Sequence, residues 1–354
     1  MTAPTPTHGS TPRRRAHPVL VVVVLVGLIV GGAFVGIRLL GNVGVAEDYP
    51  GPGTGEVVIE VEPGDSSSAI GATLAEANVV ASTEAFVDAA LADDRAVGIQ
   101  PGFFAMSKQM SADGALERLL DPAARVQIEV AIPEGLRVDE TVNRLVRASK
   151  LPRRDFVQAL ATPKRLGLPA YAEGEAEGFL FPATYSFDPD ASAEQMLTAM
   201  VARYQQAADE VGLVEGAATA GYTPREALTI ASLVQAEVAV RDFGKASRVI
   251  ANRLELGMTL GFDSTINYAL GIDDLTLVNE QLAVDSPYNT YVNVGLPPGP
   301  INSPGEAAMA AAIAPPEGDW LYFVAVAPGS DETQFTADYQ EFLQFKDEFY
   351  DQVP

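Results

Sequence analysis

Residues 223–270 read TPREALTIASLVQAEVAVRDFGKASRVIANRLELGMTLGFDSTINYAL, and this stretch predicts three successive helices. The T-P-R-E sequence at 223–226 is a capping box with proline at the first helical position, so a helix is expected to begin there. A second helix is expected from about Lys245 to Leu256, with Gly257 as the residue that ends it. Asp263 is placed to cap a short third helix that ends at Leu270.

Glu237 is the residue of this stretch that most favours a catalytic role. It shares one helical face with Ile230, Leu233 and Val234, because the four are spaced at i, i+3, i+4 and i+7. Burial on an apolar face raises the pKa of a carboxyl group, which keeps the group protonated and able to act as a general acid. The alternative is an ordinary ion pair with Arg241, worth about 0.3–0.5 kcal/mol.

The composition excludes several kinds of chemistry. The chain has 354 residues, a formal net charge of −24 and no cysteine. Nucleic acid is not an expected partner, because neutralising phosphates requires a basic face. The lack of cysteine excludes disulfides, Cys-ligated metals and thiol nucleophiles. Both histidines, His8 and His17, precede the first long apolar run, so the region after Pro18 has no Ser-His-Asp triad and no His-ligated zinc site.

An apolar run near the N-terminus predicts a membrane anchor. Val19–Ile37 is a run of 19 uncharged residues. As a helix it spans about 28 Å, close to the hydrocarbon thickness of about 30 Å. Arg13–Arg15 precede the run and acids follow it, so the positive-inside rule places residues 1–18 in the cytoplasm and the bulk of the chain outside. A cleaved signal peptide is the alternative, although its apolar region is usually only about 7–15 residues long.

The part after the anchor is expected to form two domains. Gly and Pro concentrate in 41–55 and predict a linker. A strand at 56–62 followed by helices over 67–77, 83–92 and 112–120 forms a first unit, and a strand at 126–132 begins a second. The expected order is a cytoplasmic tail at 1–18, a membrane helix at 19–40, the linker at 41–55, the first unit at 56–125 and the second at 126–354.

Three more polar residues are weaker candidates for a site. Asp263 could serve as a second active-site carboxylate as well as a cap. Glu177 precedes the aromatic turn G-F-L-F-P, where a solvated loop residue is the ordinary interpretation. Asn289 lies in the sequence Y-N-T-Y, and an amide beside aromatic rings is a common way to bind sugars. The stiff loop at 295–301, G-L-P-P-G-P-I, would suit a binding cleft.

Five segments resemble the YceG-like (MltG) family of endolytic murein transglycosylases. Their order and spacing also fit the family, and the resemblance covers most of 57–354. It implies an α+β fold class with a single N-terminal transmembrane helix, a LysM-like subdomain and an α+β YceG-like catalytic domain. The segments are EGFLFPATY (177–185), ASLVQAE (231–237), NRLELGMTLGFDSTINYA (252–269), SPYNTYVNVGLPPGPINSPG (286–305) and LYFVA (321–325).

The resemblance implies non-hydrolytic cleavage of the MurNAc–GlcNAc β-1,4 bond in peptidoglycan, which would terminate glycan elongation. Glu237 occupies the position of the family's catalytic glutamate. One carboxylate suffices because the sugar's C6 hydroxyl closes on C1, whereas ordinary glycosidases need two carboxylates. No metal or organic cofactor is implied, and the implied partners are glycan strands, the cytoplasmic membrane and peptidoglycan synthases. The implied substrate-binding residues are Glu177, Asp263, Thr265, Tyr288, Asn289 and Tyr291.

Three departures from the family's pattern keep other functions open. Gln235 replaces the first acid of the catalytic motif, Ala183 replaces the acid of P-D-T-Y, and T-Q-F at 333–335 lacks a histidine. The first two favour a non-catalytic glycan-binding scaffold of the cell-wall synthesis machinery. A two-carboxylate hydrolase that uses Glu237 with Asp263 is a further alternative.

Overall fold

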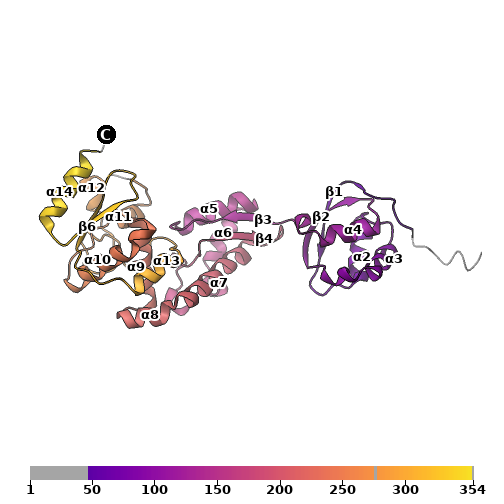
Figure 1. Ribbon diagram of the computed structural model, residues 1–354, viewed down its shortest axis with the longest axis horizontal. Helices are drawn as coiled ribbons and strands as arrows, with labels where there is room; N and C mark the ends of the chain where they lie inside the picture. The colour runs from indigo at the N-terminus through magenta and orange to yellow at the C-terminus, as the bar shows by residue number, and fades with distance from the viewer. Residues whose placement is uncertain (1–46, 275–276, 353–354) are drawn as a thin grey trace, which may run out of the picture. The chain divides into compact units, whose positions relative to one another are not determined.

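Two units make up the part of the chain that the computed structural model describes, residues 47–274 and 277–352 (Figure 1). They meet in sequence between Val126 and Gln127. Within the described residues, no helix combines the length and the apolar character needed to cross a membrane. The anchor expected at 19–40 and the tail at 1–18 lie outside the described residues.

The first unit has two antiparallel strands with two helices between them and a third helix after them. The second strand begins at Gly102 and pairs with the first strand from Val61↔Gly102 to Thr54↔Lys108. Phe104 and Met106 are buried while their neighbours are less so, as the alternation of a strand requires. The elements are β1 (Thr54–Val61), α2 (Ser67–Glu76), α3 (Thr83–Ala92), β2 (Gly102–Lys108) and α4 (Ala112–Leu120).

The second unit is mainly helical and has two separate two-stranded antiparallel sheets, which makes an α+β fold. One sheet pairs β3 (Ile128–Ala131) with β4 (Thr184–Phe187), and the other pairs β5 (Tyr322–Ala325) with β6 (Thr333–Thr336). The helices are α5 (Val138–Ser149), α6 (Arg153–Leu160), α7 (Ala193–Val211), α8 (Leu213–Ala220), α9 (Pro224–Glu237), α10 (Phe243–Glu255), α11 (Asp263–Leu270), α12 (Asn279–Leu282), α13 (Glu306–Ile313) and α14 (Tyr339–Tyr350).

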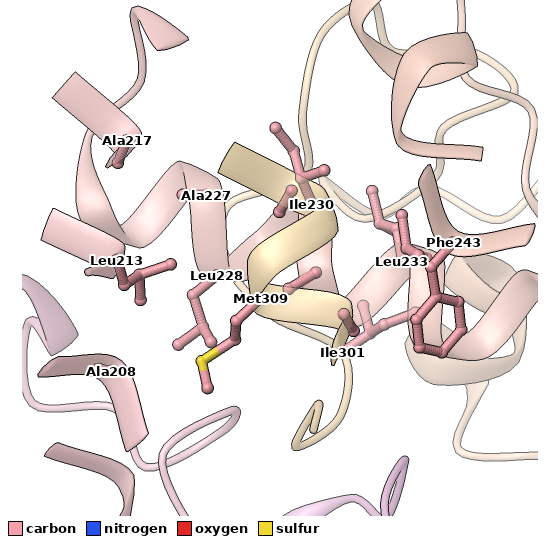
Figure 2. Packing of buried hydrophobic residues seen from close by; sticks show 14 of the residues in the cluster. Ala208, Leu213, Ala217, Ala227, Leu228, Ile230, Leu233, Phe243, Ile301 and Met309 are labelled. Carbon is pink, nitrogen blue, oxygen red and sulfur yellow. The ribbon is translucent and has the colours of Figure 1, made fainter. Parts of the chain in front are cut away.

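Helix α9 is the central helix of one of the two main cores of the second unit. It packs against α8, α10 and α13, and every residue from Ala227 to Val234 is buried (Figure 2). Ile230 and Leu233 of α9 lie in the same core as Phe243 of α10 and Met309 of α13. Full burial of such a side chain contributes about 1.5–3 kcal/mol, so this packing fixes the helix that carries Glu237.

The ends of α9 and α10 follow from local sequence. The capping box is confirmed: the Thr223 hydroxyl accepts from the Glu226 N–H at 3.2 Å, and the Thr223 N–H donates to Glu226 Oε2 at 2.8 Å. Gly257 is confirmed as the C′ residue of α10, next to the C-cap Leu256, with a φ of 65°. The Met258 N–H then bonds the Arg253 carbonyl at 2.8 Å, the bond expected of a glycine-terminated helix.

Candidate active site

Glu237 lies at the C-terminal end of α9, where the helix leaves the core and the side chain becomes half-buried. The Ser264 hydroxyl donates a hydrogen bond of 2.5 Å to Glu237 Oε1. The backbone N–H of Ser264 also bonds this carboxyl group. Because Ser264 is the second residue of α11, the Glu237 carboxyl faces the N-terminal end of that helix, where free N–H groups and the helix dipole favour negative charge.

The surroundings of Glu237 place its pKa near neutrality. Burial raises the pKa to about 7, and the nearby negative charge of Asp263 acts in the same direction. The two hydrogen bonds from Ser264 and the positive charge of Arg253 lower the pKa and limit the rise. A carboxyl group with a pKa near the working pH can both give and take a proton, which is the requirement for general acid–base catalysis.

The ion pair considered for Glu237 and Arg241 is wrong. Helix α9 ends at Glu237, and Arg241 belongs to a separate short helix at 240–242, so the i,i+4 geometry of one helix does not exist. Arg241 Nε instead lies 3.6 Å from Asp242 Oδ2. In the residues that the structure describes, the carboxyl of Glu237 is held by Ser264 and not by a salt bridge.

Asp263 is not the helix cap that its position suggested. Phe262 occupies the capping position without a side-chain bond, and Asp263 is the first residue of α11. The carboxylate of Asp263 is turned to Tyr291, whose hydroxyl donates to Oδ1 at 2.5 Å. Asp263 is exposed and close enough to raise the pKa of both Glu237 and Tyr291. Glu237, Ser264, Asp263 and Tyr291 therefore form one group.

A polar cavity of about 240 Å³ borders this group. Ala236, which precedes Glu237, and Ser264, which bonds it, both line the cavity. Arg137 is held at the wall by bonds of 2.9 Å from its Nη2 to the Ile272 carbonyl and to Asp273 Oδ1. The lining residues are Gly135, Leu136, Arg137, Glu140, Ala236, Ser264, Asn267, Asp273, Ile301 and Asn302.

Glu177 and Tyr288 belong to a second group, near Arg137. Glu177 Oε1 accepts from the Val138 N–H at 3.1 Å, and so the carboxyl holds the start of α5. Burial raises the pKa of Glu177 to about 7. Glu177 acts electrostatically on Tyr268 and Tyr288, whose ring centroids are 4.8 Å apart. Arg137 both lines the cavity and lowers the pKa of Glu177, so it links this group to the cavity.

Asn289 and Thr265 are fully buried. Asn289 Nδ2 donates to the carbonyls of Leu282 and Val284 at 3.0 and 2.8 Å, and its Oδ1 accepts from the Tyr291 N–H at 3.0 Å. The Thr265 hydroxyl lies 2.7 Å from the Phe262 carbonyl oxygen and 2.9 Å from Thr290 Oγ1. These bonds hold the loop of Tyr291 against α11. Direct contact of Asn289 and Thr265 with substrate stays a prediction.

Sequence reasoning did not single out Ser264, Arg253 or Asn302. Ser264 follows Asp263, and only the three-dimensional contact between α9 and α11 shows that it meets Glu237. Arg253 lies on α10, where a basic residue normally faces solvent. Here Arg253 is largely buried, and its Nε donates to the Leu321 carbonyl at 2.6 Å. Its positive charge lowers the pKa of Glu237. Ser264 and Arg253 lie in the family-like segment 252–269, and Asn302 lies in the segment 286–305. Membership of these segments was the signal that the sequence offered.

One departure from the family's pattern, Gln235, has a side-chain contact that explains it. Gln235 Oε1 accepts from the Gly305 N–H at 3.1 Å, so this amide fixes the loop that leads into α13. The Ala183 carbonyl accepts from the Ile132 N–H at 2.9 Å, but this backbone bond does not explain the replacement of the acid. Over the described ranges, no group of three or more His, Cys, Asp or Glu residues is arranged to hold a metal ion.

Comparison with known proteins agrees with these features. The family model of the YceG-like family matches residues 59–348. An endolytic murein transglycosylase of Bacillus subtilis is 30% identical over 339 residues, which cover 91% of both chains. One of Streptococcus pneumoniae serotype 2 is 31% identical over 300 residues, covering 76% of this chain and 54% of that protein. A solved YceG-like structure from Listeria monocytogenes has a TM-score of 0.55 at 27% identity and covers 82% of this chain and 98% of its own. The chain belongs to the YceG-like family.

Proposed function

We propose that this chain is an endolytic murein transglycosylase that cleaves MurNAc–GlcNAc β-1,4 bonds in peptidoglycan and leaves 1,6-anhydroMurNAc ends. The observation that carries the proposal is Glu237, a half-buried carboxyl with a pKa of about 7 beside a polar cavity. The Bacillus subtilis relative, which matches this chain over 91% of its length, is named for the same activity.

Glu237 acts first as an acid and then as a base. Its proton passes to the glycosidic oxygen as the bond to C1 of MurNAc breaks, and the freed GlcNAc end leaves as an alcohol. The C6 hydroxyl of the same MurNAc attacks C1, and its proton passes to the Glu237 carboxylate. The residue returns to its starting state, and no water enters the products.

The partners of Glu237 support this double role. Ser264 donates to Oε1, which leaves Oε2 to exchange the proton with the sugar. The Ser264 bonds and Arg253 stabilise the carboxylate that exists between the two steps. Asp263 is bonded to Tyr291 and contributes its charge to the pKa of Glu237, so the proposal gives it no proton to transfer.

The same proposal includes the location and the first unit. Residues 19–37 anchor the enzyme in the cytoplasmic membrane, and the arginines at 13–15 keep the N-terminus inside, so both units lie outside. The first unit is LysM-like, a proposal supported by its order of strand, two helices and strand, with the two strands paired antiparallel. It would bind glycan strands, and peptidoglycan synthases are proposed partners.

Digestion of purified glycan strands by the full-length protein in detergent, followed by mass spectrometry, tests the proposal. We expect products with 1,6-anhydro ends. Reducing ends would replace the proposal with a two-carboxylate hydrolase. Strands that bind but stay uncut would replace it with the non-catalytic scaffold.

A further inference from the structure

We infer that Thr290 is a positioning residue of this active site, because its buried hydroxyl fixes the start of α11 so that Ser264 meets Glu237. The inference rests on the proposed function and adds to it a residue that acts without touching the sugar. Thr290 lies in the loop between α12 and α13 and is 1% exposed, so it acts through the residues that it bonds.

The N-terminus of α11 takes a hydrogen-bond acceptor from this distant loop. Phe262 occupies the N-cap position, makes no side-chain cap bond and is buried. The N–H at that position needs an acceptor, which in a capping box comes from the third residue of the helix. That residue is Thr265, but its hydroxyl donates to the Phe262 carbonyl at 2.7 Å. The Phe262 N–H bonds Thr290 Oγ1 instead, at 2.9 Å.

The two threonine hydroxyls have one consistent arrangement of protons. Their oxygens lie 2.9 Å apart, and both side chains are buried. Because the single hydroxyl proton of Thr265 goes to the Phe262 carbonyl, Thr290 donates in the bond between the two hydroxyls. Thr290 therefore both accepts from the helix start and donates to the helix, and no other common hydrophobic residue of its size can do either.

The same loop bonds the residues on both sides of Ser264. Together, Thr290 and Tyr291 bond residues 261, 262, 263 and 265, and Ser264 within this run bonds Glu237. The remaining contacts are the Gly261 N–H to the Thr290 carbonyl at 2.9 Å and the Tyr291 hydroxyl to Asp263 Oδ1 at 2.5 Å. A loop that loses the Thr290 hydroxyl would hold this run less firmly and let Ser264 move away from Glu237.

Movement of Ser264 has an effect that can be measured apart from stability. The Ser264 bonds lower the pKa of Glu237, so their loss would raise it further. The charged or titratable groups that also face Glu237 are Asp263 of α11, Arg253 of α10 and Tyr291 of the loop. A hydroxyl with a merely structural role would change stability and leave the pKa of Glu237 where it is.

The pH profile of kcat/KM for release of anhydro ends by the full-length protein tests this role. Thr290→Val keeps the shape of the side chain without its hydroxyl. It should lower the maximum of kcat/KM about 10-fold or more and move the profile to higher pH. Thr290→Ser keeps the hydroxyl and should restore both. Thr229→Val removes a hydroxyl of α9 that is equally buried and bonds the Arg225 carbonyl, and it should leave the profile unchanged.

The route through Ser264 is tested in a double variant. In a Ser264→Ala background, Thr290→Val should add little further shift, because the hydroxyl bond that it disturbs is already gone. An equal additional shift in that background would overturn the inference, and so would an unshifted profile for Thr290→Val. Should Thr290→Val fail to fold, Thr290→Cys, with a weak donor and acceptor, should give a smaller shift in the same direction, and an unshifted profile would count equally against the inference.

A measurement without turnover separates this inference from the proposed function. Urea titrations at pH 8 give the stability gained on Glu237→Gln, which should be larger in the Thr290→Val protein than in the wild type because the pKa of Glu237 is higher there. An equal gain in both would overturn the positioning role. A wild-type protein that releases no anhydro ends would reject the proposed function, whereas the positioning of Glu237 would still be judged from these titrations.

Discussion

Replacing Glu237 with glutamine should stabilise the second unit at pH 8 but not at pH 4. The folded pKa of about 7 exceeds the ordinary value of 4.5, so folding favours the protonated form. In the wild type that stability is fully present below about pH 4.5 and is lost as the pH rises to about 7. The difference between these pKa values sets an upper limit of about 3 kcal/mol, and solvent at the half-buried side chain reduces the expected gain to about 1–2 kcal/mol.

Fluorescence of Trp320, the single tryptophan, reports unfolding of the second unit. Urea titrations of full-length wild type and Glu237→Gln at pH 4 and pH 8 give the two differences in unfolding free energy. Glu215→Gln, at an exposed glutamate of α8, is the matched control. A Glu237→Gln effect of equal size at both pH values would refute the raised pKa.

The same variant should lose activity, because glutamine keeps the Ser264 bond but transfers no proton. General acid–base catalysis contributes about 10²–10⁴-fold, so release of anhydro ends should fall at least about 100-fold at matched folded concentration. Cleavage at the wild-type rate by a folded variant would remove Glu237 from the mechanism.

Three further predictions test the neighbours of Glu237 and the topology. Ser264→Ala removes the hydroxyl bond that lowers the pKa of Glu237, so the pH profile of kcat/KM should move to higher pH, and an unchanged profile would argue against that contact. Asp263→Asn removes a charge that raises the same pKa, so the profile should move to lower pH with less than about a 10-fold loss in rate; a loss above about 100-fold would favour the hydrolase. Protease added to intact spheroplasts should digest the region after residue 41, and full protection of that region would contradict the proposed topology.

The parts of the fold that sequence predicts are those set by neighbours along the chain. The capping box at Thr223 begins one helix and the glycine at 257 terminates another. Both depend on bonds between residues no more than five apart, so both were predictable. The apolar face of α9 was also visible, because a helical period needs only one stretch of sequence. Glu237 could be singled out on that face before any contact was known.

Contacts between distant segments were not predictable in the same way. Asp263 has the position of a cap, and only the loop carrying Tyr291, 28 residues later, turns its carboxylate elsewhere. Asn289 was singled out for a sugar, and its sequence did not show that its amide bonds three backbone groups of its own loop. Strand β2 depends on pairing with β1, whose sequence is far away, and no local rule specifies that partner.

Burial is the main cause of the raised pKa of Glu237, and two residues at the N-terminus of α11 adjust that pKa. Asp263 raises the pKa of Glu237 and the adjacent Ser264 lowers it, so two consecutive residues act in opposite directions on the same group. A much higher pKa would keep Glu237 protonated but make it a weak proton donor. A much lower pKa would leave Glu237 ionised when the glycosidic oxygen needs a proton. A chain with no histidine after Pro18 has no imidazole to share this task. The opposite effects of positions 263 and 264 therefore help to keep the pKa of the single glutamate between these two limits.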